Sequence, residues 1–224
     1  MEQVSIVIPV YNQMKMTINC LRDVIRTYGV ETEIIVVDDG SKEPIKRILP
    51  KLFPDIKLLI NESNMGFAPT VNKGIKAASH DLICLLNNDI NLPNPGWLKK
   101  MTEAMAEFDL TAPAGGRMDK NWNYQPGEAK TRKDKFSYLV GWCILFKREV
   151  IDEIGLIPED FGKGFFEDVL FCYRAEKAGF KMGITEGTEV KHLYHTTFKA
   201  EGFNLTQEYQ NKREIFLDII RKEK

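Results

Sequence analysis

The stretch VSIVIPVYN at residues 4–12 decides the fold class, because a run of apolar, mostly β-branched residues stops abruptly at polar ones. Such runs are typical of strands that are covered on both faces in a parallel sheet. Runs of the same kind lie at 33–37, 56–60 and 81–86. The first hundred residues therefore predict a parallel sheet to which the segment 4–10 contributes a strand.

Helical periodicity separates these strands. Apolar residues recur on one stripe at 18–25, 45–52 and 71–78. Strands that alternate with helices predict right-handed crossovers, which place helices on both faces of a doubly wound α/β sheet. In such folds ligands bind at the carboxyl ends of strands, so the polar residues that follow each strand are the first candidates for chemistry.

The second half of the chain is less regular. The patterns predict a helix at 97–108, a strand at 140–146, a helix at 167–178 and an amphipathic helix at 205–222. The polar stretch 117–135 has no clear period and predicts a loop. Its charged cluster 130–135 is expected to be a solvated face, with a phosphate-contacting loop as the alternative. We expect the last helix to pack on the sheet or on a partner.

Composition excludes some classes of protein. The 224 residues carry a formal net charge of -1, which leaves no basic field to attract nucleic acid. Residues 1–10 hold no basic leader and no apolar run is long enough to span a bilayer, so we expect a cytoplasmic protein, with peripheral membrane association open. The cysteines are expected to be buried free thiols: Cys20, Cys84, Cys143 and Cys172.

Polar residues follow three of the predicted strands, and each group has an ordinary explanation as a turn or helix cap. The groups are Pro9, Tyr11 and Asn12; Asp38 and Asp39; and Asn87, Asn88 and Asp89. A fourth stretch, NMGFAPTVNKG at 64–74, opens a helix after a glycine turn, where free backbone N–H groups can face a nucleotide. An acid such as Asp89 at the mouth of a parallel sheet can hold a hard cation between two phosphates.

Taken together and in order, these four pieces resemble the family 2 glycosyltransferases with a GT-A fold. The resemblance covers about 4–197 and includes the pair Glu167-Asp168. Its nearest branch is similar to the rhamnosyltransferases, whose third strand often ends Leu-Leu-Asn-x-Asp. It implies a single GT-A domain at 1–204, and we expect the C-terminal amphipathic helix at 205–224 to follow it. Within the domain, about 1–100 would bind the nucleotide and about 101–204 the acceptor.

The resemblance implies a nucleotide pocket for a pyrimidine, as in a UDP- or dTDP-sugar. Asp39 would accept the N3–H of the base. The implied pocket residues are Pro9, Tyr11, Asn12, Asp38, Asp39, Asn64, Gly66, Phe67, Asn72 and Asn88.

It also implies a divalent cation, Mn²⁺ or Mg²⁺. Asn87-Asn88-Asp89 occupies the place of the family's D-x-D, so only Asp89 remains there as a ligand. His192 is the second implied ligand and His195 its alternative. A histidine suits manganese better than magnesium.

Glu167 and Asp168 match the family's Glu-Asp motif, which makes Asp168 the implied catalytic base and Glu167 its partner. The alternative is that two acids merely complement the dipole at the start of a helix. The family usually has a further acid two residues later, where this chain has Leu170. Trp142 is expected either to stack beneath a sugar or to be a core tryptophan.

These residues predict an inverting glycosyltransferase that uses a nucleotide-sugar donor and a glycan, lipid-linked or other hydroxyl acceptor, as in polysaccharide biosynthesis. A non-catalytic nucleotide-sugar-binding protein is one alternative. A sugar nucleotidyltransferase is another, and it is disfavoured because no glycine-rich loop with lysine or arginine follows the first strand.

Overall fold

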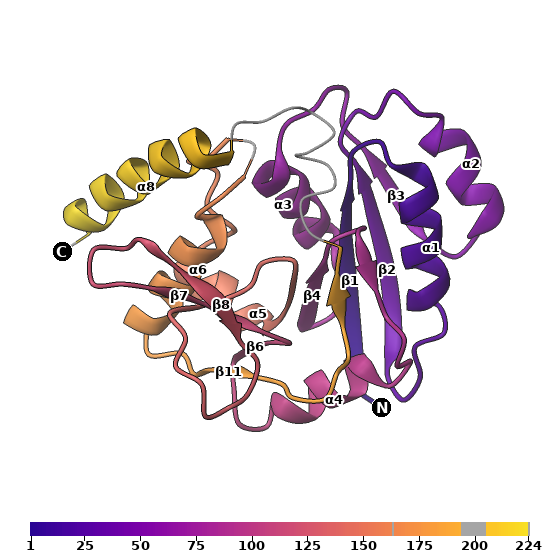
Figure 1. Ribbon diagram of the computed structural model, residues 1–224. Helices are drawn as coiled ribbons and strands as arrows, with labels where there is room; N and C mark the ends of the chain where they lie inside the picture. Colours follow the sequence, from indigo (N-terminus) through magenta and orange to yellow (C-terminus); the bar gives the residue numbers. More distant parts are fainter. Residues whose placement is uncertain (163, 194–204, 224) are drawn as a thin grey trace.

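The computed structural model of the protein describes residues 1–162, 164–193 and 205–223 (Figure 1). Its elements are β1 Gln3–Val10, α1 Met14–Val24, β2 Glu31–Asp38, α2 Ile45–Leu52, β3 Lys57–Ile60, α3 Phe67–Ala77, β4 Leu82–Leu86, β5 Ile90–Asn91, α4 Trp97–Ala104, β6 Leu110–Ala112, β7 Gly115–Met118, β8 Tyr124–Ala129, β9 Tyr138–Leu139, β10 Cys143–Lys147, α5 Arg148–Ile154, α6 Glu167–Lys177, β11 Met182–Ile184, β12 Lys191–His192 and α8 Leu205–Lys222.

A seven-stranded sheet with the order β11-β6-β10-β4-β1-β2-β3 forms the centre of the fold. The neighbours β4, β1, β2 and β3 run parallel, whereas β10 is antiparallel to both β4 and β6. The β1–β4 pairing ends at Val7, so Pro9, which has no N–H, lies where this side of the ladder has stopped. The predicted mostly parallel α/β sheet is confirmed.

The two faces of the sheet have separate cores, because successive side chains of a strand point to opposite sides. Val7 of β1 packs on the side of α3, α5 and α6, whereas Ile6 and Ile8 pack on the side of α1, α2 and α4. Helices therefore cover both faces, as predicted. The four cysteines are buried free thiols, also as predicted. No described helix combines the length and apolar character that a bilayer span requires.

The predicted loop at 117–135 was wrong in part. β7 and β8 form a hairpin there, and with β9 they make a second sheet of three strands. The strand YQPGEA at 124–129 lacks apolar alternation because most of its residues are exposed and two of them are proline and glycine, so the pattern hid it. The charged cluster 130–135 does lie in the loop after β8 and is mostly exposed.

The last helix, α8, forms as predicted but packs elsewhere than on the large sheet. Figure 1 shows it along the side of α6, next to the β7–β8 hairpin. Its buried Phe216 and Ile220 join a third apolar cluster with Phe166 and Leu170, and Met118 and Trp122 from the hairpin pack on that cluster. Helix α5, which no pattern predicted, is a short helix that follows β10 without a break.

Candidate functional site

The loops that follow β1 and β2 are fastened to each other. The backbone N–H of Asn12 donates to Ser41 Oγ at 2.7 Å, and Lys42 N donates to Asn12 Oδ1 at 2.9 Å. Asn12 and Gln13 both have left-handed backbone angles, with φ of 55° and 56°, which turn the chain sharply from β1 into α1. Tyr11 is partly buried beside them. The parallel strands thus bring the first predicted residues together at one edge of the sheet.

Asp39 organises the loop before α3. Its carboxylate accepts hydrogen bonds from Asn61 Nδ2 at 2.9 Å, from Met65 N at 2.8 Å and from Gly66 N at 3.0 Å. An ionised carboxylate has about four acceptor positions, so one remains for a donor from a ligand. Asp39 is almost buried, with 5% of its surface exposed.

Other predicted residues at this edge support the same loops. Asp38 Oδ1 accepts from Ser41 N at 3.0 Å, and Asn64 Oδ1 accepts from Gly66 N at 3.1 Å. A side chain at Gly40 would meet backbone atoms of Ser63 at 2.6 Å, so only glycine lets the two loops approach.

Two predicted nucleotide contacts, Asn72 and Asn88, are engaged with other parts of the chain. The amide of Asn72 donates to Ile157 O and to Glu159 Oε1, both at 2.8 Å, and accepts from Ile157 N at 3.0 Å. Asn88 Nδ2 donates to Thr17 Oγ1 in α1 at 2.9 Å. Sequence reasoning missed these partners, which are about 70 to 90 residues away along the chain. A direct nucleotide contact by either asparagine stays a prediction.

Asp89 and His192 meet, although 103 residues separate them. His192 Nε2 lies 3.1 Å from Asp89 Oδ1, and their side chains are 7% and 8% exposed. The short strands β5 and β12 pair to bring them together, and Leu193 N donates to Asp89 O at 3.0 Å. His195, the alternative ligand, lies outside the described residues.

A carboxylate oxygen beside an imidazole nitrogen fits a divalent cation such as Mn²⁺. Within the described ranges, no group of three histidine, cysteine or acidic side chains could hold an ion. Asp89 and His192 would therefore share a cation with water or with substrate phosphates, which is the usual arrangement for a substrate-bound ion.

The turn at Gly141-Trp142 contacts both His192, of the Asp89–His192 pair (the cation pair), and Asp168, the predicted base. The ring of Trp142 stacks on His192 with centroids 5.3 Å apart and planes at 14°, and Trp142 O accepts from Asn87 N at 2.9 Å. One residue earlier, Gly141 N donates to Asp168 Oδ2 at 3.0 Å. A Cβ at position 141 would lie 3.0 Å from Asp168 Cβ, so glycine permits this approach.

Glu167 and Asp168 are the first two residues of α6 and are partly buried. Burial raises the pKa of Asp168 to about 6. The hydrogen bonds from Gly141 N and Val169 N act in the opposite direction and lower this pKa, but their effect is smaller. Burial, and then the neighbouring charge of Asp168, raise the pKa of Glu167 to about 8. In the described part of the chain, Glu167 Oε2 is buried without a hydrogen-bond partner, which suits a protonated acid.

The backbone before these acids is unusual. Phe165 and Phe166 both lie in the left-handed region, with φ of 73° and 70°. For bulky residues this conformation costs of the order of 1–3 kcal/mol each and persists only where the surroundings impose it. Such outliers cluster at functional sites. The dipole alternative explains two acids at a helix start, but it does not explain the bond from Asp168 to Gly141.

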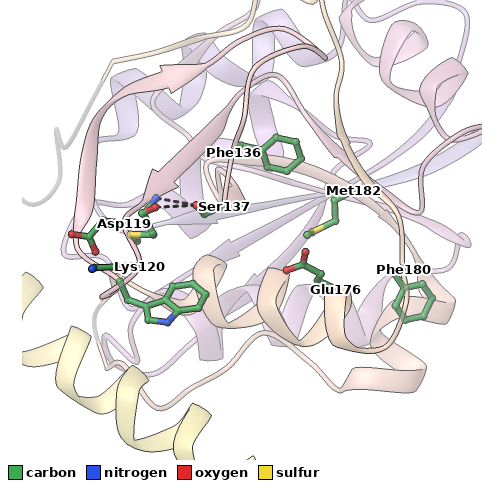
Figure 2. A pocket seen from close by; sticks show the side chains of 9 residues that line it. Asp119, Lys120, Phe136, Ser137, Glu176, Phe180 and Met182 are labelled. Atoms are coloured by element: carbon green, nitrogen blue, oxygen red, sulfur yellow. Dashed lines mark hydrogen bonds between the residues drawn. The ribbon is translucent and has the colours of Figure 1, made fainter. Parts of the chain in front are cut away.

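A cavity lined by other residues is drawn in Figure 2. Its volume is about 470 Å³, and it is lined by Met118, Asp119, Lys120, Trp122, Phe136, Ser137, Glu176, Phe180 and Met182. Glu176 is near the far end of α6, roughly 14 Å along the helix from Glu167. Sequence reasoning gave no signal for this cavity, and no predicted site residue lines it.

Comparison with known proteins shows the family and the fold of the chain. The family model described as glycosyl transferase family 2 matches residues 5–155. The glycosyltransferase AglE of Haloferax volcanii is 26% identical over 197 residues, which are 80% of this chain and 63% of AglE. A mannosyltransferase of Pyrobaculum calidifontis in complex with GDP-Man and Mn²⁺ superposes with a TM-score of 0.68 at 16% identity, over 88% of this chain and 59% of that one. GalNAc-T7 with UDP, GalNAc and Mn²⁺ gives a TM-score of 0.73 at 16% identity, over 86% and 44%.

The chain thus spans less than two thirds of each of these proteins. At 16% identity the structural likeness shows the fold alone, and it confirms the predicted GT-A fold. The two neighbours hold nucleotides with different bases, so the fold does not decide between purine and pyrimidine. The rhamnosyltransferase-like branch and the two halves of the domain stay predictions.

Proposed function

The chain belongs to glycosyl transferase family 2, and on that premise we propose that it moves a sugar from a UDP- or dTDP-linked donor to an acceptor hydroxyl with inversion. The observation that carries the proposal is the placement of Asp168. Its carboxylate accepts from Gly141 N, and the next residue, Trp142, stacks on His192 of the cation pair. In an inverting transfer the hydroxyl attacks opposite the diphosphate, so a base and a leaving-group stabiliser must flank the sugar. The Gly141-Trp142 turn contacts the residues proposed for both roles: Asp168 as the base and His192 as a ligand of the cation.

Asp168 is suited to act as the general base. A base works best when its pKa is near the operating pH, and burial raises that of Asp168 to about 6. Hydrogen bonds from Gly141 N and Val169 N favour the ionised form of Asp168, whereas Glu167 Oε2 is buried without a partner among the described residues. Asp168 is therefore the carboxyl of the pair that is suited to accept a proton. The acceptor proton passes to Asp168 as the acceptor oxygen bonds to the anomeric carbon and the bond to the diphosphate breaks.

Asp39 is the proposed contact to the base of the nucleotide, through the acceptor position that its three protein bonds leave open. Four more residues complete this pocket in the proposal: Pro9 near the end of β1, Tyr11 and Asn64 in the loops that follow β1 and β3, and Phe67 at the start of α3. Asn72 and Asn88 support it indirectly, since they hold the 157–159 loop and α1 in place.

Asp89 and His192 would hold the divalent cation, with the imidazole favouring Mn²⁺ over Mg²⁺. When bound, such a cation offsets the negative charge that grows on the departing diphosphate. Trp142 is partly exposed, and its ring fixes the orientation of His192 by stacking on it. In the proposal, the edge of the same ring contacts the sugar. The acceptor is proposed to be a glycan, a lipid-linked sugar or another hydroxyl compound on the cytoplasmic side, as in polysaccharide biosynthesis.

Product analysis tests this function. The purified chain is screened for stabilisation by UDP, dTDP and GDP with Mn²⁺, and the corresponding sugars are then incubated with a panel of hydroxyl acceptors. We expect release of UDP or dTDP together with a glycoside whose anomeric configuration, read from NMR couplings, is opposite to that of the donor. Binding without any product would favour the nucleotide-sugar-binding alternative. Release of pyrophosphate would favour the nucleotidyltransferase, and a retained configuration would contradict inversion.

A further inference from the structure

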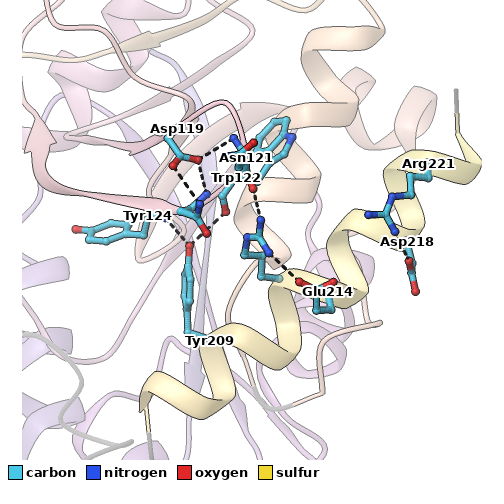
Figure 3. Close-up of polar contacts among 10 residues, drawn as sticks. Asp119, Asn121, Trp122, Tyr124, Tyr209, Glu214, Asp218 and Arg221 are labelled. Atoms are coloured by element: carbon cyan, nitrogen blue, oxygen red, sulfur yellow. Dashed lines mark hydrogen bonds and ion pairs between the residues drawn. The ribbon is translucent and has the colours of Figure 1, made fainter.

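Helix α8 is bound tightly to the turn of the β7–β8 hairpin (Figure 3). The hydroxyl of Tyr209 accepts a hydrogen bond from Tyr124 N at 2.6 Å. Arg213 Nη2 donates to Asn121 O, and Asp119 closes the turn by accepting from Asn121 N at 2.8 Å. These are bonds from side chains to backbone, so they fix the path of the hairpin turn.

The same helix is joined to the far end of α6. Glu223, directly after α8, accepts from Arg174 Nη2 at 2.7 Å, and its backbone oxygen accepts from Lys177 Nζ at 2.8 Å. Arg174 and Glu223 are each 28% exposed, so their pairing is partly shielded from water. Helix α6 is therefore held at the end opposite its two acids.

At the near end of α6, two aromatic side chains of α8 pack on Phe166. The ring centroids of Tyr209 and Phe216 lie 5.1 Å and 5.4 Å from that of Phe166. Phe166 is 3% exposed and immediately precedes Glu167 and Asp168. A bulky residue adopts left-handed backbone angles only when its surroundings impose them. Here two rings of α8 contact Phe166, and Phe161 packs on it as well.

Charge on α8 also reaches the acids. Lys212 lowers the pKa of Glu167, against the larger effect of burial. Among the described residues, Tyr138 of β9 and Cys172 of α6 itself are titratable groups that interact with Asp168. α8 thus contributes both apolar cover and a cation to the environment of the two acids.

We propose that α8 is a positioning element of the catalytic site: through Tyr209 and Phe216 it holds Phe166 in its left-handed conformation and thereby sets the direction of Glu167 and Asp168. The proposal rests on Asp168 being the base of the proposed transfer. It makes α8 a part of the active site that acts through Phe166. A helix that merely covers an apolar surface would affect stability and leave catalysis unchanged.

The first test compares Phe216→Ala with Phe53→Ala in the full chain. Phe53 is a buried phenylalanine at the end of α2, on the other side of the sheet, and serves as the matched loss of one ring. We expect both variants to melt at lower temperature, while only Phe216→Ala lowers kcat, by about tenfold to a hundredfold, because small displacements of a reacting group are costly. Nucleotide Kd should stay within about twofold for both. Phe216→Leu should recover most of the kcat. Equal kcat values for Phe216→Ala and Phe53→Ala would overturn the proposal.

A second pair covers the case in which Phe216→Ala does not fold. Tyr209→Phe keeps the ring on Phe166 and removes the bond to Tyr124, whereas Tyr209→Ala removes both. We expect Tyr209→Ala to lower kcat much more than Tyr209→Phe. Equal kcat values for these two variants would show that the ring does not position the acids.

A readout independent of turnover separates this inference from the proposed function. Carboxyl ¹³C NMR titration should show the pKa of Asp168 falling toward its ordinary value in Phe216→Ala or Tyr209→Ala as water enters, and staying near 6 in Phe53→Ala. An unchanged Asp168 pKa in the α8 variants would contradict the inference. Wild-type turnover in Asp168→Asn, measured in parallel, would instead remove the proposed function.

Discussion

Two helices of this protein begin after a pair of residues with left-handed backbone angles, and the two pairs are held by different forces. Before α1 the pair is Asn12-Gln13, and Asn12 is fixed by hydrogen bonds to Ser41 and Lys42. Before α6 the pair is Phe165-Phe166, and Phe166 is fixed by aromatic packing from α8.

In the proposed function, the first pair belongs to the nucleotide side and the second pair to the catalytic side. Hydrogen bonds between adjacent strand-end loops make the first arrangement local, with partners about thirty residues apart. The second arrangement needs a helix from the far end of the chain. Binding of the nucleotide should therefore resist changes in the carboxyl-terminal part, whereas catalysis should not.

Removal of divalent cations should have the largest effect, because the proposed cation joins both halves of the chain. Asp89 comes from the first half and His192 from the second. EDTA is expected to abolish transfer, and Mn²⁺, or less effectively Mg²⁺, to restore it. Rates are measured in exhaustively chelated buffer and after metal titration. Full activity in that buffer would show that the pair holds no functional ion.

Asp168→Asn should break catalysis while sparing binding. Asparagine keeps the shape of the side chain and cannot take a proton, so turnover should fall about a hundredfold to ten-thousandfold with nucleotide Kd nearly unchanged. Asp160→Asn, an exposed aspartate before α6, is the matched control and should behave as wild type. If Asp168→Asn also kept wild-type turnover, the acid would be only a favourable charge at a helix start.

Asp39→Ala should weaken nucleotide binding without a specific effect on the chemical step. It removes the proposed acceptor for the base, whose donor would then be unpaired in the pocket at a cost of about 1–3 kcal/mol. Met65 N also loses the carboxylate, whereas Gly66 N keeps its bond to Asn64 Oδ1. Calorimetry with UDP and dTDP measures the loss. Asn61→Ala removes only one donor to Asp39, so an equal loss there would assign the effect to loop order rather than to a base contact.

The smallest effect concerns the dependence of stability on pH. The folded-state pKa of Glu167 is raised from 4.5 to about 8, so the folded state binds the proton more tightly than the unfolded state and stability falls as pH rises through this window. Glu167→Gln should remove part of that slope and be more stable than wild type above pH 8, by roughly 1–2 kcal/mol. Urea unfolding at several pH values tests this. Glu153→Gln, an exposed glutamate of α5, should follow the wild-type curve.

The strand-end part of the site could be predicted from sequence because its signals are local. Strand runs end at Asn12, Asp39 and Asp89, and parallel strands bring such ends to one edge. The pairing of Asp89 with His192 followed only from family resemblance. No local pattern contains the register of β5 against β12.

The rest could not be predicted because it depends on distant contacts or on weak patterns. Two contacts join segments that share no sequence pattern. One is the hydrogen bond from Gly141 N to Asp168, and the other is the hydrogen bond from Asn72 to Ile157 O in the 157–159 loop. The β7–β8 hairpin has an exposed strand without apolar alternation. The conformation of Phe166 depends on packing from α8, so the sequence around Phe166 holds no signal that predicts it.

Because the Gly141-Trp142 turn contacts both Asp168 and His192, the two sites are expected to evolve together. A side chain at 141 would press on Asp168, and a smaller residue at 142 would withdraw the surface on which His192 rests. Substitutions that share a contact are seldom additive, so changes here would be tolerated jointly or not at all. Exposed segments such as the 130–135 loop lie outside both sites and can vary more freely.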